Sequence, residues 1–111
     1  MDMIRALAGL SALGQETRLS AFRTLAQAGP DGLLAGEISA RTGALQNTMS
    51  THLAILQQAG LISSRREGRS VRYFADMNGM EALLAFLLED CCGGRPDLCR
   101  KVLAEVRCGC A

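Results

Sequence analysis

The stretch from Gly36 to Phe74 constrains the fold more than any other part of this chain. Its first part predicts a short helix over Ala35–Arg41, which ends at Gly43, a residue type that readily takes a positive φ. A second helix is predicted over Gln46–Gln58 and ends at Gly60. Two helices joined by a short glycine turn form a helix-turn-helix unit.

A β-hairpin is predicted directly after this helix pair. The residue pattern favours strands over Leu61–Arg66 and Val71–Ala75, around the turn Glu67-Gly68-Arg69-Ser70. The order helix, turn, helix, hairpin predicts a winged helix-turn-helix fold, which is mainly α with a small β-hairpin. In that fold the second helix enters the DNA major groove and the hairpin lies against the phosphates. We call the helix over Gln46–Gln58 the recognition helix and the hairpin the wing.

Helical patterns also cover most of the remaining chain. Further helices are predicted over Asp2–Ala12, Gln15–Ala28, Met77–Asp90 and from Pro96 to about Arg107. Three helices carry apolar stripes with helical spacing. The stripe residues are Leu45, Met49, Leu53 and Leu56; Leu19, Phe22, Leu25 and Ala26; and Met80, Leu83, Leu84, Leu87 and Leu88.

The composition fits one helical domain. With 111 residues the chain has the length of a single domain, in which we expect a core over residues 1–90 and a cysteine-bearing segment over residues 91–111. Apolar residues make up 49% and aromatic residues only 4%, which favours packed helices over a β-sandwich.

Charge is distributed unevenly, although the formal net charge is only +1. Thr42–Ser64, which contains the recognition helix, has no Asp, Glu, Lys or Arg. Leu61–Ala75 carries four arginines against one glutamate, and Asp76–Asp90 carries four acidic residues and no base. A basic patch beside an acidic segment predicts a protein that contacts a polyanion with one face.

No segment has the length and apolarity of a signal peptide or a membrane span. We therefore expect a cytoplasmic protein that does not bind membranes. Thiols stay reduced in the cytosol, so the five cysteines indicate metal or redox chemistry more than structural disulfides. Their odd number also argues against a closed disulfide framework.

The polar face of the recognition helix predicts contacts to DNA. It carries Gln46, Asn47, Thr48, Ser50, Thr51 and His52. Glutamine and asparagine can bond adenine edges through two hydrogen bonds, and hydroxyl groups can bond bases or phosphates. A solvated polar face has the same sequence pattern. The basic wing that follows favours DNA, because phosphate contact and base contact usually occur together.

The wing supplies candidate phosphate contacts. Arg65, Arg66 and Arg69 can bind phosphates or reach the minor groove, and the Tyr73 hydroxyl can donate to a phosphate. The alternatives are a solvated charged turn for the arginines and packing within the strand for Tyr73. His52, the only histidine, is expected to face either DNA or the adjacent core.

Several motifs in combination resemble the ArsR-type metalloregulatory repressors. The motifs are Ala12–Leu19, Ser50–Leu53 with Leu56, Ala59–Ile62, and Arg65–Arg69 with Tyr73. The resemblance extends from about Leu7 to Asp90, and it implies a homodimeric repressor that dimerises through its first and fifth helices. It also implies a double-stranded palindromic operator, no required cofactor, and release from DNA by a toxic metal or metalloid ion.

The resemblance narrows the place where such an ion can bind. The founding arsenic sensors of the family carry a Cys-x-Cys-x-x-Cys run in the helix that matches Ala35–Arg41, where this chain has no cysteine. The zinc sensors of the family use histidine and carboxylate pairs on the last dimer helix. The only histidine here, His52, lies on the recognition helix. We therefore expect both of those sites to be absent.

The remaining candidate is a metal site formed by Cys91, Cys92 and Cys99. Thiolates select thiophilic ions, and trivalent arsenic or antimony binds three of them in a trigonal pyramid. Gly93-Gly94 lets a helix end fray, so that adjacent cysteines can reach one ion. Pro96 suits the first turn of a helix whose positive end favours the Cys99 thiolate. The spacing resembles that of family members with a C-terminal vicinal-cysteine arsenite site.

Alternatives stay open for these cysteines. They can be small apolar residues at a helix end, ligands of cadmium, lead or zinc, or thiols that sense oxidation. The cysteines of one site can come from one subunit or from both. Cys108 and Cys110 are interpreted as part of a tail, as spare ligands or as a redox partner. An enzyme is not expected, because the chain has no Cys-x-x-Cys, no βαβ pattern and no cysteine followed six residues later by arginine.

Overall fold

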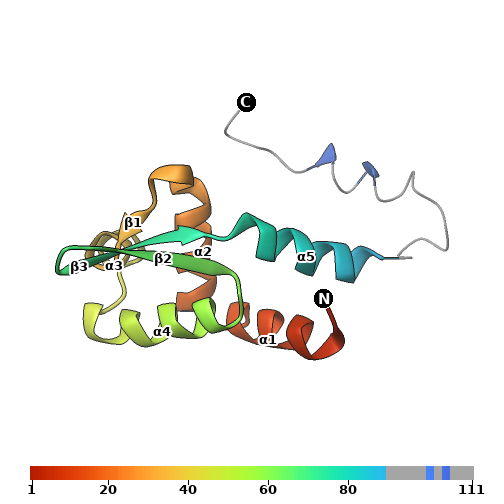
Figure 1. The fold of residues 1–111 in the computed structure, drawn as a ribbon, viewed down its shortest axis with the longest axis horizontal. Helices are drawn as coiled ribbons and strands as arrows, with labels where there is room; N and C mark the ends of the chain where they lie inside the picture. The colour runs from red at the N-terminus through yellow and green to blue at the C-terminus, as the bar shows by residue number, and fades with distance from the viewer. Residues whose placement is uncertain (90–99, 102–103, 106–111) are drawn as a thin grey trace.

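A computed structural model describes residues 1–89, 100–101 and 104–105 of the chain. Their main elements, in order, are α1 (Met3–Leu13), α2 (Glu16–Ala28), the 3-10 helix η1 (Gly29–Asp31), β1 (Leu33–Leu34), α3 (Ala35–Thr42), α4 (Gln46–Gln58), β2 (Ile62–Glu67), β3 (Ser70–Ala75) and α5 (Met77–Leu88). Figure 1 shows a long hairpin of β2 and β3 above α4, with α1 and α5 at the opposite end from the hairpin turn. This is the predicted winged helix-turn-helix fold, with α4 as the recognition helix and β2–β3 as the wing. The predicted helix that starts at Pro96 lies mostly outside the described residues.

The helix-turn-helix unit consists of α3 and α4. The recognition helix begins and ends at the predicted residues, and α3 continues one residue beyond the prediction, to Thr42. Gly43 follows with φ 76° and ψ 3°, and its N–H donates to the Ser39 carbonyl at 2.9 Å. This left-handed conformation, which glycine adopts without strain, ends α3 and redirects the chain into α4.

The sheet contains one strand more than the prediction. β1 pairs antiparallel with β3, with Leu33 opposite Tyr73, so the strand order is β1-β3-β2. A strand of two residues is too short to show alternation, and periodicity therefore cannot reveal it. The predicted wing strands are also corrected by one residue, to Ile62–Glu67 and Ser70–Ala75, which leaves Gly68-Arg69 as the turn. β1 attaches the wing to the segment that leads into α3.

The recognition helix is anchored in the core by its apolar stripe. Met49, Leu53 and Leu56 are fully buried, as predicted. The prediction is wrong at Leu45, which is 70% exposed. Leu45 has an extended backbone as the N-cap of α4, so its side chain does not follow the helical spacing.

In α2 the predicted stripe is confirmed only in part. Phe22 and Leu25 are buried, but Leu19 is 44% exposed and Ala26 is exposed as well. Steps of three residues drift by about 60° around a helix, so Leu19 lies on the flank of the face that Phe22 and Leu25 bury.

α1 and α5 contact each other and expose apolar side chains. Leu83 of α5 is buried and packs beside Gly9 of α1. The predicted α5 stripe is only partly buried in this chain, because Leu83 is buried whereas Leu84 and Leu87 are 46% and 44% exposed. α5 ends at Leu88, two residues before the predicted end. The exposed large apolar residues of the two helices are Met3, Ile4, Leu7, Leu10, Met77, Leu84 and Leu87.

The start of α5 lies against the loop that follows α4. A Cβ atom on Gly79 would meet the backbone carbonyl of Gly60, so this approach requires glycine. Asp76 caps α5 by accepting a hydrogen bond from the Gly79 N–H at 3.0 Å, and its own N–H donates to the Leu61 carbonyl at 2.8 Å. The loop directly after the recognition helix and the beginning of α5 are therefore in direct backbone contact.

Candidate nucleic-acid interface

One side of α4 presents most of the polar residues that were predicted to contact DNA. Gln46, Asn47, Thr48, Ser50 and Thr51 are exposed, whereas His52 is half-buried. The Thr48 hydroxyl donates to the Leu45 carbonyl at 3.0 Å, within the first turn of the helix. The exposed amides and hydroxyls offer both donors and acceptors, as base edges require.

An ion network orders one face of the wing. Glu67 accepts hydrogen bonds from Arg65 Nη2 and from Arg72 Nε, each at 3.0 Å. Arg72 also donates from Nη1 to the Asp31 carbonyl at 3.2 Å, and the Arg65 guanidinium carbon lies 5.1 Å from the centre of the Phe74 ring. The hydrogen bonds from Arg65 and Arg72 lower the pKa of Glu67 below its ordinary value. Arg65, a predicted phosphate contact, thus has a carboxylate partner inside the wing.

The other predicted wing residues lie apart from this network. Arg66 is on the opposite face of β2 from Arg65, because side chains alternate along a strand, and its Nε donates to the Gly68 carbonyl at 3.3 Å. Arg69 is exposed in the wing turn, and Tyr73 is half-buried in β3. Arg66 and Arg69 are therefore the wing cations that do not pair with Glu67.

A groove of about 550 Å³ lies between the recognition helix and the wing. Four predicted DNA contacts line it: Gln46, Ser50, Arg69 and Tyr73. The other predicted contacts are not among its lining residues: Asn47, Thr48, Thr51, His52, Arg65 and Arg66. The fold thus brings an amide, two hydroxyls and a guanidinium from α4 and the wing to one concave surface, and all of these groups can donate hydrogen bonds to a sugar–phosphate backbone.

The start of α3 also lines this groove, which the sequence did not predict. Ala35, Gly36 and Glu37 line it, and a Cβ on Gly36 would lie 3.6 Å from the side-chain nitrogen of Gln46. Glu37 accepts a hydrogen bond from the Leu34 N–H at 2.9 Å and so caps α3. A glutamate three positions after a helix N-cap is the sequence signal for this arrangement.

Arg18 also has a role that the sequence did not predict. Its Nη1 lies 3.3 Å from Nδ1 of His52, so the half-buried imidazole contacts α2. Of the two surroundings expected for His52, the structure therefore shows a contact on the protein side. No periodicity in the sequence indicates such a pair, because its members are 34 residues apart.

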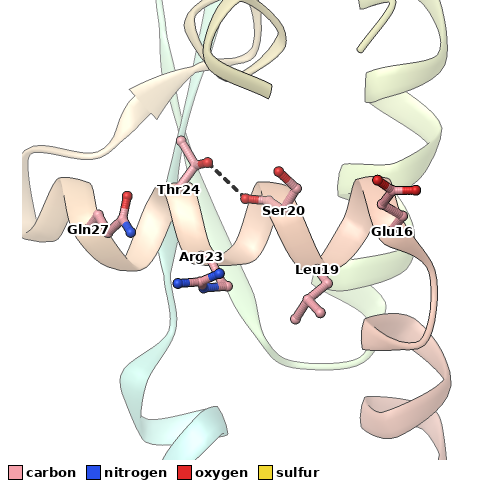
Figure 2. A pocket seen from close by; sticks show the side chains of 6 residues that line it. All are labelled: Glu16, Leu19, Ser20, Arg23, Thr24 and Gln27. Carbon is pink, nitrogen blue, oxygen red and sulfur yellow. Dashed lines mark hydrogen bonds between the residues drawn. The ribbon is translucent and has the colours of Figure 1, made fainter. Parts of the chain in front are cut away.

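A hollow of about 360 Å³ on α2 does not form a comparable site. All of its lining residues belong to this one helix, and Figure 2 shows them spread along it: Glu16, Leu19, Ser20, Arg23, Thr24 and Gln27. The Thr24 hydroxyl donates a hydrogen bond to the Ser20 carbonyl at 2.8 Å. These side chains do not converge on one ligand position.

The predicted metal site lies outside the described residues, as do Cys108 and Cys110. Cys91, Cys92 and Cys99 fall in the range 90–99, and Cys108 and Cys110 fall in the range 106–111; the structure describes neither range. In residues 1–89, 100–101 and 104–105, no group of three or more His, Cys, Asp or Glu side chains is placed to hold a metal ion. In the same part of the chain, no helix has the length and apolarity needed to cross a bilayer.

Comparison with known proteins places this geometry among transcriptional regulators. A family model described as a helix-turn-helix domain matches residues 13–65. The chain is 38% identical over 78 residues to a Halobacterium salinarum protein named as an arsenical resistance operon repressor, ArsR2. That match covers 70% of this chain and 64% of the Halobacterium protein, so the chain spans just under two thirds of that relative's length.

Two further relatives are similar over more of their length. The transcriptional activator HlyU of Vibrio cholerae is 31% identical over 83 residues, which cover 75% of this chain and 74% of HlyU. The structure of reduced HlyU has a TM-score of 0.61 at 30% identity and covers 80% of this chain and 90% of that one. A homodimeric winged helix-turn-helix DNA-binding domain from Mycobacterium bovis, Mb0332, described as a possible ArsR-family regulator, has a TM-score of 0.62 at 27% identity, with 79% and 82% covered.

Proposed function

Because this chain belongs to the ArsR-type family of winged helix-turn-helix transcriptional regulators, we propose that it is an arsenite-responsive repressor. In this proposal a homodimer binds double-stranded operator DNA through α4 and the wing. Trivalent arsenic, or antimony, binds the thiolates of Cys91, Cys92 and Cys99 and thereby releases the dimer from DNA. The observation that carries the DNA-binding part is the groove at which side chains of α4 and the wing converge.

Two kinds of contact are proposed at this interface: base contacts from α4 and phosphate contacts from the wing. The exposed amides and hydroxyls of α4 bond base edges in the major groove, and Arg66 and Arg69 neutralise phosphates. Each neutralised phosphate makes the slope of log affinity against log salt concentration steeper by about 0.9. Sequence preference therefore comes from Gln46, Asn47 and their neighbours, and salt dependence comes from the wing.

The exposed apolar residues of α1 and α5 support the homodimer. Large apolar side chains are exposed on both helices: Ile4 and Leu7 on α1, and Leu84 and Leu87 on α5. Both helices lie at the end of the molecule opposite the wing turn (Figure 1). A second copy that covers them removes this surface from water, which is the main driving force of association. The similar Mycobacterium domain is homodimeric. Two recognition helices about 34 Å apart then match successive major grooves.

The cysteines and one relative support arsenic as the inducer. α3, the helix that carries cysteines in the founding arsenic sensors, has none here, and all five cysteines of the chain follow α5. Three thiolates match the trigonal binding of trivalent arsenic. The name of the Halobacterium relative connects that protein to arsenical resistance. Near-complete release requires arsenic to favour the released state by about 5.5 kcal/mol.

The backbone contact between α5 and the loop directly after α4 supports the switch. Arsenic draws Cys99 toward Cys91 and Cys92, which changes the end of α5. The start of α5 touches Gly60 directly after the recognition helix, so a tilt of α5 alters the placement of α4. In this proposal the tilted pair of recognition helices no longer matches the operator spacing.

The central test uses Cys99→Ser in an electrophoretic mobility shift assay. This variant should bind operator DNA like the wild type and should stay bound when arsenite is added, because the third thiolate is missing. Cys108→Ser is the matched control and should be released like the wild type. Release of Cys99→Ser by arsenite would show that the assigned ligand set is wrong. No binding of the wild type to any duplex at low salt would contradict the repressor itself.

The same cysteines support a second candidate, a repressor that senses cadmium, lead, zinc or thiol oxidation. A solved structure of the similar protein HlyU is described as the reduced form. This favours testing a redox response in the present chain. Tetrahedral binding by four sulfurs would recruit Cys108 or Cys110, which three-sulfur arsenic binding does not need. Operator release by arsenite, cadmium and peroxide, compared between wild type and Cys108→Ser, separates the candidates. X-ray absorption of the arsenic-loaded protein counts the sulfur ligands directly.

A further inference from the structure

Arg18 connects three helices through its hydrogen bonds. Its backbone N–H donates to the Gln15 side-chain oxygen at 2.9 Å, which caps α2. Its Nε donates to the Ala12 carbonyl at 2.7 Å, and its Nη1 lies 3.3 Å from Nδ1 of His52. One side chain therefore joins the last turn of α1, the first turn of α2 and the middle of α4.

The chemistry of the two side chains defines the contact with His52. A guanidinium group only donates hydrogen bonds, so Nδ1 of His52 accepts. A neutral imidazole that accepts at Nδ1 carries its proton at Nε2. Arg18 thus selects the tautomer of His52 as well as the position of its ring.

The bond to Ala12 fixes the guanidinium relative to α1. Ala12 lies in the last turn of that helix, where carbonyl groups have no partner within the helix. A cation at a helix C-terminus is further favoured by the helix dipole. Arg18 is half-buried, so these interactions are screened less than those of a surface cation.

His52 lies between a core anchor and a predicted DNA contact. Leu53, the next residue, is fully buried, and Thr51, the preceding one, is exposed. Apolar packing holds α4 against the core, but it is not directional and permits small rotations of the helix. A hydrogen bond is directional, so the contact between Arg18 and His52 restricts rotation of α4 about its axis. That rotation determines which base edges the polar face meets.

We propose that Arg18 is a positioning residue for DNA recognition, which sets the rotation of α4 and links it to α1 without contacting DNA. The inference rests on the proposed DNA-binding function. Because α1 carries part of the exposed apolar surface assigned to the second subunit, the same link makes the orientation of the recognition helix depend on the dimer.

The test compares Arg18→Met with Arg23→Met, a change of an exposed arginine on the same helix. The probes are the duplex that the wild type selects from a random library and a scrambled duplex of the same composition. Arg18→Met should bind the selected duplex about tenfold more weakly, which is the loss of roughly one base contact, and should bind the scrambled duplex unchanged. Its salt slope should equal that of the wild type, because Arg18 neutralises no phosphate. Arg23→Met should match the wild type throughout.

Three results would overturn the inference, two from the single variant and one from the double variant. For the single variant, one is an unchanged preference for the selected duplex, and the other is a salt slope that is shallower by about 0.9, which makes Arg18 a phosphate ligand. In a His52→Ala background, the effect of Arg18→Met should largely disappear, and additive losses would contradict action through His52.

Folding and function are separated by two further measurements. Circular dichroism verifies that the compared variants are folded. If Arg18→Met does not fold, Arg18→Lys gives the same test, because it keeps the charge but loses the fork that reaches Ala12 and His52 together. If the wild type binds neither duplex, the proposed function fails, whereas a wild type that binds beside an unaffected Arg18 variant contradicts only this inference.

Discussion

The recognition helix and the wing are held in place by different forces. Three fully buried residues, Met49, Leu53 and Leu56, anchor α4, and the helix contains no Asp, Glu, Lys or Arg. In the wing, strand pairing and the carboxylate of Glu67 arrange the arginines at the surface. Core packing is insensitive to salt, whereas exposed ion pairs are weak and screened. In the proposed DNA complex, base contact would therefore depend on a rigid element and phosphate contact on an adaptable one.

The largest expected effect is at the anchors of α4. Leu53→Ala removes a fully buried side chain and should lower the free energy of unfolding by about 3 kcal/mol, through lost burial and the cavity that remains. Denaturant unfolding measures this change. Leu45→Ala, at the exposed N-cap of the same helix, should cost less than about 0.5 kcal/mol. Equal costs in the two variants would contradict the contrast between anchor and surface.

A smaller effect is expected at the base-contacting face. Gln46→Ala should weaken binding to the preferred duplex by about 1–2 kcal/mol and should leave binding to a scrambled duplex unchanged. Fluorescence anisotropy with both duplexes measures the two affinities. If both affinities fall equally, Gln46 contacts the backbone and not a base.

The matching substitution in the wing should weaken DNA binding by a similar amount for every DNA sequence. Arg69→Ala should weaken binding to both duplexes by a similar amount, on the order of 1 kcal/mol, and should make the salt slope shallower by about 0.9. Titrations at several salt concentrations provide the slope. A change in base preference with an unaltered slope would show that the wing contacts bases and would remove the division between the two regions.

The smallest effect is expected for Glu67→Gln, and it depends on pH. Arg65 and Arg72 lower the pKa of Glu67 below 4.5, so folding favours its ionised form. The resulting stabilisation is present above the ordinary carboxyl pKa and is lost as pH falls through the lower folded value. Glu67→Gln should therefore be slightly less stable than the wild type near neutral pH and equally stable in acid. Denaturation midpoints at both pH values measure this, and a difference that grows in acid would give the opposite sign for the shift.

The recognition helix was predictable because its signals are local. Gly43 and Gly60 bound it, and the spacing of Met49, Leu53 and Leu56 marks its buried face, so its bounds match the prediction. The polar face opposite the stripe follows from the same periodicity. Leu45 was wrongly included in the buried stripe, because it precedes the first residue of α4 and its backbone is extended.

The parts that sequence reasoning did not find depend on contacts between distant segments. β1 is defined only by its pairing with β3, and the groove needs the start of α3 beside the wing. Arg18 meets His52 because α2 and α4 are packed together, although the two residues are 34 apart in the chain. No residue spacing encodes these distances. The three-cysteine site stays a prediction, since its residues lie outside the described ranges.

The close approach of Gly79 to Gly60 has a consequence for how the protein can vary. Any side chain at position 79 would separate the two backbones, and α5 would have to swing away from the loop after α4. In the proposed switch, a single added methyl group would thus move α5 relative to the recognition helix without any ligand. If that switch operates, mutants at this glycine should bind operator DNA weakly even in the absence of arsenite.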